Sequence, residues 1–341
     1  MVAKKLAFSV LNIGISAALL GYLLWQASRS DVLAELSRPD PPKNWMLLGV
    51  GWFANLTAIT LNIFRWRVLV RAQGINLGVR DALRIGYLSY FVGLVGGGLG
   101  VVGGDAVKVV FLAHKYPGSK TAAAATVVVD RLIGLLALIV LAAAASFFLD
   151  WRQLQFASAA DRAMMERLVL LVQVSAACGL IGGAVILLPG FTHSRLWDAL
   201  AHVPKIGKVL ERMVAAVRIY RNQSGKLLWL FLLSIFVHIL LTSSLFCVAE
   251  GLALNRPPFG LYFVIGPIAF VTGALPVGVF EVTLKVLYQV SAAGVDQEGL
   301  ITALGHRLLQ TGVAAIGLVI YLATRAESAA LIQEGQKEDE K

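Results

Sequence analysis

The sequence predicts an all-α polytopic membrane protein built as an inverted repeat, and three observations support this fold class. The 341 residues are 58% hydrophobic and 15% charged, with a mean hydropathy of +0.76. Six apolar stretches approach or exceed the roughly 20 residues that a helix needs to cross a hydrocarbon core of about 30 Å. A charged signature also occurs twice, each time beside a break rich in glycine or proline. We therefore expect about six full spans plus two Gly/Pro-broken re-entrant hairpins, or seven or eight spans if the hairpins are counted.

The predicted spans are continuous apolar stretches with few charges. They cover residues 6–25, 45–64, 122–149, 168–188, 227–249 and 300–323. The first follows Lys4 and Lys5 and is longer than the apolar core of a typical signal peptide, so we interpret it as an uncleaved span. Cys178 and Cys247 fall within spans, where cysteine is more often a small buried residue than half of a disulfide or metal pair. The sequence predicts no metal site and no cofactor.

Loop charges predict the orientation of the spans. Basic residues predominate before the first span and in residues 65–84 and 191–226, whereas the loop after the first span is balanced. The positive-inside bias therefore places both termini in the cytoplasm and the chain in the inner cell membrane. The formal net charge of +10 lies in loops beside spans, so we expect contact with anionic lipid rather than with nucleic acid. We also expect Arg65 and Arg67, at the end of the second span, to extend toward lipid headgroups.

Two further apolar segments do not fit as single spans. Residues 85–114 run between two basic segments, so a single crossing would place Lys115 outside. Residues 259–293 begin after an outer loop and end at a loop without lysine or arginine. We predict that each is a helical hairpin that enters the membrane and returns, the first from the cytoplasmic side and the second from outside. The predicted breakers are Gly98, Gly100, Gly103 and Gly104 in the first hairpin, and Gly273, Pro276 and Gly278 in the second.

The order span, span, hairpin, span is thus predicted to occur twice, in opposite orientations. Residues 1–325 form a single transmembrane domain, with one half at about 5–150 and the other at about 166–325, and a polar cytoplasmic tail covers 326–341. Inverted repeats with broken segments in matching positions point to a transporter site near the membrane midplane. The alternative is a chance match in a chain rich in glycine and alanine.

The repeated charges supply the candidate substrate-binding residues. Asp105 precedes Arg131 by the same number of residues that separates Glu281 from Arg307. Charged side chains cost about 3 to over 10 kcal/mol at the centre of a bilayer, so a duplicated set points to a substrate site. Weaker candidates close to them in the sequence are Lys108, Asp130, Lys285 and His306.

Each of these charges also has a structural interpretation. Asp105 and Glu281 lie near the predicted N-termini of the returning helices, where an acid can serve only as a helix cap. Arg131 and Arg307 could pair with them to neutralise charge inside the protein. The arginines could instead bind a phosphate, because a planar guanidinium bonds two oxygens at once. The sequence leaves both roles open.

Two motifs of soluble nucleotide-binding proteins are rejected. Residues 98–103 spell GxGxxG, but membrane-length apolar helices flank them and no βαβ unit surrounds them. Residues 127–130 resemble a Walker B strand, but no GxxxxGK[ST] motif accompanies them. The sequence therefore predicts no ATP site.

The charged runs resemble those of a known family. Residues 103–108, 130–134 and 275–281, together with Arg307, are similar to the lysylphosphatidylglycerol synthase transmembrane family. This family is also called flippase-like and supplies the membrane half of the multiple peptide resistance factor. The resemblance covers about residues 5–325. In this chain the second break is shorter and poorer in glycine than the family usually has, and Lys108 stands where the family often has arginine.

The resemblance implies a lipid translocase that moves an anionic or aminoacylated phospholipid, or a lipid carrier, between leaflets. It does not imply lysyl transfer, because in the bifunctional members that chemistry lies in a soluble C-terminal domain, and a short polar tail follows residue 323 here. We therefore expect no enzyme activity, and a membrane phospholipid or lipid-linked substrate as the partner. One alternative is an ion- or proton-coupled transporter of a small solute, with Asp105 and Glu281 as proton carriers. The other is a non-transporting scaffold that binds a partner through residues 191–226, which form either an amphipathic surface helix or a solvated connector.

Overall fold

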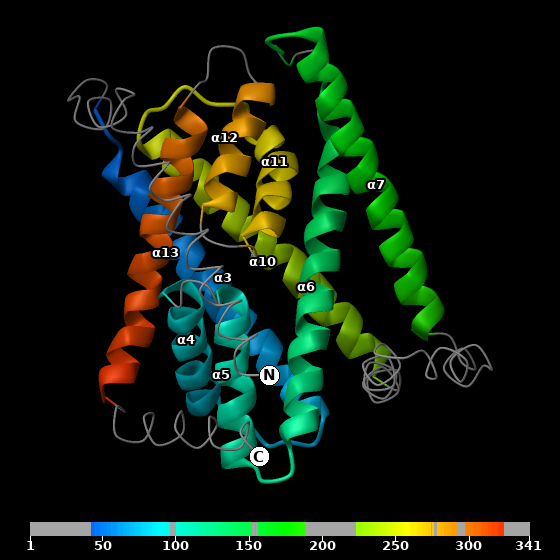
Figure 1. Cartoon of the computed structure of the whole chain (residues 1–341), viewed down its shortest axis with the longest axis vertical. Helices are drawn as coiled ribbons and strands as arrows, with labels where there is room; N and C mark the ends of the chain where they lie inside the picture. Colours follow the sequence, from blue (N-terminus) through cyan, green and yellow to red (C-terminus); the bar gives the residue numbers. More distant parts are fainter. Residues whose placement is uncertain are drawn as a thin grey trace, which may run out of the picture.

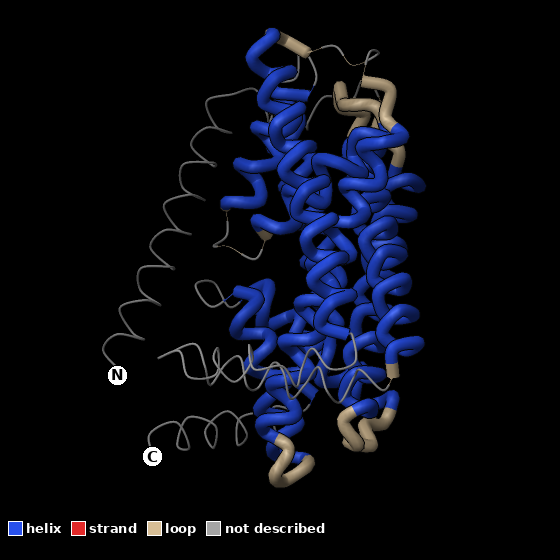
Figure 2. The backbone as a smooth tube through the Cα atoms, turned by 90° about the vertical axis from the view of Figure 1, so that its right-hand side faces the viewer, coloured by secondary structure: helices blue, strands red, loops and turns tan. Residues whose placement is uncertain are grey.

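The computed structural model describes residues 42–95, 100–151, 154, 156–187, 223–273, 275, 278–291 and 297–323. In these ranges the chain is an elongated bundle of helices without strands (Figure 1; Figure 2). The predicted first span, almost all of residues 191–226, and the tail lie outside the described residues. The helices are α3 (Trp45–Ala72), α4 (Val79–Val95), α5 (Gly100–Lys115), α6 (Lys120–Phe148), α7 (Ala159–Leu187), α10 (Ser224–Gly251), α11 (Phe259–Thr272), α12 (Val279–Ser291) and α13 (Glu298–Ala323).

Five of these helices are long and apolar enough to cross a membrane, namely α3, α6, α7, α10 and α13. They confirm five of the six predicted spans. The helix α7 begins nine residues before the predicted span at 168, because Asp161, Arg162 and Glu166 continue the helix beyond the apolar stretch. Hydropathy marks where a helix lies in hydrocarbon, whereas the backbone hydrogen bonds of the helix continue past that boundary.

Two pairs of shorter helices form the predicted hairpins. The helices α4 and α5 occupy the lower part of the bundle in Figure 1, and α11 and α12 occupy the upper part. None of the four reaches the length of a full span. The two hairpins therefore enter the bundle from opposite ends, as the sequence predicts.

The packing of the helices follows the inverted repeat. Within each half, the second hairpin helix packs against the last span, which pairs α5 with α6 and α12 with α13. Between the halves, the first hairpin helix packs against the last span of the other half, which pairs α4 with α13 and α11 with α6. The long spans α3 and α10, which hold equivalent positions, pack along each other at the centre. Each hairpin is therefore held by both halves of the chain.

Small residues allow the closest of these crossings. Gly317 of α13 lies so near α4 that a Cβ at this position would come within 2.2 Å of the carbonyl oxygen of Tyr87. Close approach of backbones through glycine is a common way to pack helices in membranes, where lipid is as apolar as the helix surfaces. On either side of the crossing, buried apolar side chains form one cluster around α3, α4 and α5 and another around α11 and α12.

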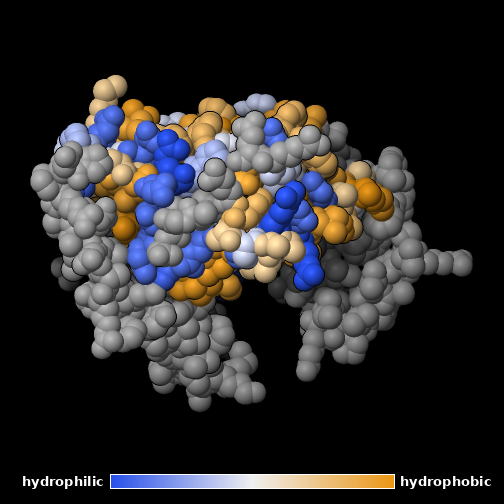
Figure 3. Space-filling model, turned by 90° about the horizontal axis from the view of Figure 1, so that it is seen from above, coloured by the Kyte–Doolittle hydropathy of each residue, from blue (hydrophilic) through white to orange (hydrophobic). Residues whose placement is uncertain are grey.

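The outer surface of the bundle has the composition expected in a bilayer. Large apolar side chains are exposed along the long helices, among them Phe53, Leu171, Ile181, Leu232 and Leu308. Seen from above, patches of hydrophilic residues lie among apolar ones (Figure 3). Apolar side chains along the spans and polar ones at their ends match the hydrocarbon and headgroup layers.

Candidate functional site

The first repeated acid and arginine meet in space. Arg131 of α6 donates two parallel hydrogen bonds to Asp105 of α5, from Nε to Oδ2 at 2.8 Å and from Nη2 to Oδ1 at 2.7 Å. This fork-to-fork arrangement is the strongest geometry for an arginine and a carboxylate. Asp105 lies in the second turn of α5, so it holds the arginine rather than capping the helix.

The second acid and arginine also meet, but here the two carboxylate oxygens have different partners. Arg307 of α13 donates from Nε to Oε1 of Glu281 at 3.0 Å, and its Nη2 is 3.0 Å from the same oxygen. The other oxygen, Oε2, accepts a hydrogen bond from the backbone N–H of Gly278 at 3.0 Å. Gly278 has a φ of 105° and precedes α12 directly. Glu281 therefore caps the returning helix and holds the arginine at the same time.

Both arginines lie near mid-depth of their spans. At 1.5 Å per residue, Arg131 is about 16 Å from the start of α6 at Lys120, and Arg307 is about 14 Å from the start of α13 at Glu298. Half of a hydrocarbon core is about 15 Å. The two ion pairs therefore place charge where it is most costly to leave unpaired.

The arginines keep part of their surface accessible although their acids are largely enclosed. The Arg131 side chain is 50% exposed and that of Asp105 is 16% exposed. The corresponding values are 26% for Arg307 and 1% for Glu281. A guanidinium has five N–H donors, and Asp105 accepts hydrogen bonds from two of the N–H groups of Arg131. Donors of both arginines are thus left to bind a further group.

Lys108 lies beside the first pair. Its Nζ is 3.8 Å from Oδ1 of Asp105, the same oxygen that Arg131 contacts through Nη2. The ammonium also lies 5.3 Å from the ring centroid of Trp66. The side chain of Lys108 is 13% exposed, so this second cation is largely enclosed within the bundle.

A third ion pair, which the sequence does not predict, joins three spans. Arg65 of α3 donates from Nε to Oδ1 of Asp130 at 2.8 Å, from Nη2 to the Asp130 carbonyl at 3.1 Å and from Nη1 to Oγ of Ser234 at 2.7 Å. Both charged side chains are 4% exposed. The expectation that Arg65 extends to headgroups is wrong, because the carboxylate on α6 holds it inside the bundle. Asp130 is placed away from the accessible face of Arg131 for the same reason.

Comparison of the sequence with known families finds one match. The sequence model of the lysylphosphatidylglycerol synthase TM region matches residues 9–317. The chain belongs to this family. No curated protein matches the chain. Membership associates the chain with the membrane and with lipid, and the matched residues include all three ion pairs.

The residue before the second repeated arginine differs from its counterpart in the first half. His306 stands where the first half has Asp130, and it is fully buried. Its ring lies 5.6 Å from that of Phe270 and 6.3 Å from that of Phe280, measured between centroids. The structure therefore places His306 in an aromatic core rather than on an accessible surface. Lys285, one turn after Glu281, is half-buried on α12.

The predicted breakers divide into two groups. Gly100 begins α5, and Gly273 and Gly278 flank the interval between α11 and α12, which places them at breaks. Gly98 and Pro276 lie outside the described residues. For Gly103 and Gly104 the prediction is wrong, because both lie inside α5. Gly104 instead serves close packing, since a Cβ there would come within 2.4 Å of the carbonyl oxygen of Ser89 on α4.

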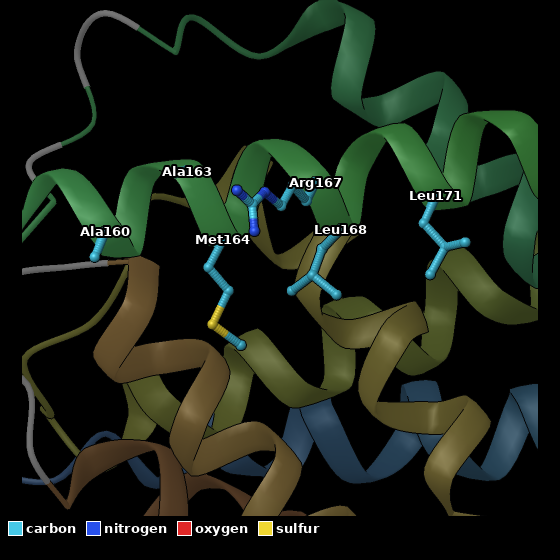
Figure 4. A pocket seen from close by; sticks show the side chains of 6 residues that line it. All are labelled: Ala160, Ala163, Met164, Arg167, Leu168 and Leu171. Atoms are coloured by element: carbon cyan, nitrogen blue, oxygen red, sulfur yellow. The ribbon is translucent and has the colours of Figure 1, made fainter.

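A cavity of about 490 Å³ lies along α7, apart from the ion pairs. The described residues that line it are Ala160, Ala163, Met164, Arg167, Leu168 and Leu171. Figure 4 shows the side chains of Met164, Leu168 and Leu171 extending from the same side of α7. The lining is mostly apolar, with Arg167 as its charged member, and none of the repeated arginines belongs to it. Among the described residues, no group of three or more side chains is arranged to hold a metal ion.

Proposed function

We propose that this member of the family moves an anionic or aminoacylated phospholipid, or a related lipid carrier, between the leaflets without converting it chemically. One observation carries this proposal. Each inverted half contributes a mid-depth arginine that an acid of the returning hairpin helix holds in place, while part of the guanidinium is still exposed. A headgroup that crosses the hydrocarbon core needs such polar partners along its path.

The hairpins give this path two entrances. The pair α4 and α5 enters from one end of the bundle, and α11 and α12 enter from the other. We place the first end in the cytoplasm of an inner membrane, because Arg71, Arg80 and Arg84 cluster beside it. A headgroup could then pass from one arginine to the other along the crossing of the two halves.

Lipid movement in proteoliposomes tests this proposal. The probes are short-chain fluorescent phospholipids, and dithionite destroys the fluorescence of those in the outer leaflet. Wild-type protein should let dithionite destroy most of the signal, including the signal that began in the inner leaflet. The Arg131→Ala/Arg307→Ala double variant should lose this movement, since both headgroup partners are gone.

The matched control is Arg71→Ala/Arg162→Ala, which removes two exposed arginines near the ends of α3 and α7. It should move lipid at the wild-type rate. If the Arg131→Ala/Arg307→Ala variant inserts normally and moves lipid as fast as wild type, the arginines do not bind headgroups. If the wild-type protein accelerates the movement of no lipid among several with different headgroups, translocation itself is contradicted.

A further inference from the structure

Among the described residues of the first half, positive charge exceeds negative charge at mid-depth. Three cationic side chains, Arg65, Lys108 and Arg131, lie beside two carboxylates, Asp105 and Asp130. Arg65 and Asp130 are paired with each other and buried. Asp105 accepts two hydrogen bonds from Arg131. Lys108 interacts electrostatically with both carboxylates, but each is already paired with an arginine, so this cluster of described residues carries one positive charge in excess.

Lys108 and Arg131 converge on a single oxygen atom. Nη2 of Arg131 is 2.7 Å and Nζ of Lys108 is 3.8 Å from Oδ1 of Asp105. The two nitrogens are thus no farther apart than these distances combined, a separation that the oxygens of one phosphate can bridge. At 3.8 Å the contact of Nζ with Asp105 is too long for a hydrogen bond. Within the described residues, the ammonium also lies over the Trp66 ring and is attracted by Asp130, which Arg65 already pairs.

An anion bound at this point would complete the coordination of both cations. Desolvation makes an incompletely paired ammonium costly inside a protein, and an opposite charge offsets that cost. Arg131 can contribute its remaining N–H donors, because its side chain is half-exposed. The second half offers less access, since Arg307 is 26% exposed and packs over the ring of Phe280. The geometry therefore favours binding of an anionic group in the first half rather than in the second.

We infer that Lys108 and Arg131 together bind the phosphate of a lipid headgroup, and that this site selects lipids of net negative charge over zwitterionic and lysylated ones. The inference rests on the proposed function and narrows its range of substrates. A lysyl group would bring a second ammonium close to Lys108, and like charges repel strongly where water is scarce. A bare phosphodiester meets no such opposition.

Lipid binding to the purified protein in detergent tests this site without requiring transport. The ligands are short-chain phosphatidylglycerol, phosphatidylcholine and lysylphosphatidylglycerol, with glycerol phosphate and inorganic phosphate as soluble competitors. Wild type should bind phosphatidylglycerol most tightly. Lys108→Gln should weaken that binding about ten-fold, the effect of losing one charged hydrogen bond, and should leave binding of phosphatidylcholine unchanged.

Two further variants accompany Lys108→Gln. Lys115→Gln makes the same change two turns along α5, where Lys115 pairs with Asp81 at 2.7 Å near the end of the bundle, and it should bind as wild type. Lys108→Arg keeps the charge and should keep the preference for phosphatidylglycerol. Lys108→Gln should fold, because Asp105 retains both hydrogen bonds from Arg131.

Specific outcomes overturn the inference. Equal affinity of wild type for phosphatidylglycerol and phosphatidylcholine would do so, as would unchanged binding in Lys108→Gln. Competition by glycerol phosphate or inorganic phosphate as strong as that by lipid would assign the site to a soluble phosphate. In vesicles, equal movement of both lipids would leave translocation intact and refute the selectivity. Binding that depends on Lys108 without any lipid movement would support the site and contradict the proposed function.

Discussion

Asp130→Ala should lower the free energy of unfolding by about 3–5 kcal/mol, the range measured when one partner of a buried ion pair is removed. The variant leaves the Arg65 guanidinium inside the bundle, with Ser234 as its other side-chain partner. Because Arg65, Asp130 and Ser234 belong to α3, α6 and α10, the loss also loosens the contact of three spans. Reversible unfolding of the protein in detergent micelles measures the effect.

The control for this change is Asp161→Ala. Asp161 lies at the exposed start of α7, where it interacts with the hydroxyl of Ser158, and its loss should cost no more than about 1 kcal/mol. The double variant Arg65→Leu/Asp130→Leu should be more stable than Asp130→Ala, since it removes both charges. An Asp130→Ala protein as stable as wild type would show that this pair does not hold the spans together.

Gly317→Ala should weaken the contact between the two halves and destabilise the protein by about 1–3 kcal/mol, the usual cost of overpacking. The new Cβ would meet the carbonyl oxygen of Tyr87 at 2.2 Å and Cβ of Phe91 at 2.7 Å, so α4 or α13 must move. The same unfolding experiment measures the loss. Gly182→Ala on α7 is the matched control, because no atom lies within 4 Å of the position of its Cβ.

Gly182→Ala should be neutral or slightly stabilising, since alanine has the higher helix propensity. If both substitutions have the same effect, the crossing of α4 and α13 tolerates a side chain. The interface between the halves would then depend on other contacts.

The fold could be predicted to the level of helix order because two physical constraints act directly on the sequence. The length of apolar stretches reports spans, and the distribution of lysine and arginine reports sidedness. Together they identified residues 85–114 and 259–293 as hairpins, which the structure contains as α4 with α5 and α11 with α12. The reciprocal packing of α4 on α13 and of α11 on α6 could not be predicted, since it depends on shapes of distant helix surfaces.

The site was predicted in part. The equal spacing of Asp105 from Arg131 and of Glu281 from Arg307 indicated related roles, but tertiary packing decides whether each pair meets. The partner of Arg65 was missed because 65 positions separate it from Asp130. One signal was present, since adjacent residues of a helix point about 100° apart. Asp130 and Arg131 therefore point in different directions, which indicates that each has its own partner.

Because the two halves pack on each other, some helix surfaces stay without their partner until later parts of the chain have been synthesised. Asp105 with Arg131 and Glu281 with Arg307 each pair within one half, so each half can form its repeated ion pair as it enters the bilayer. The apolar surface of α4 is different, because its partner α13 follows roughly 200 residues later. At about 5–20 residues per second, α4 stays without that helix for on the order of ten seconds. During this interval lipid or an insertion chaperone must cover the surface that α13 later occupies.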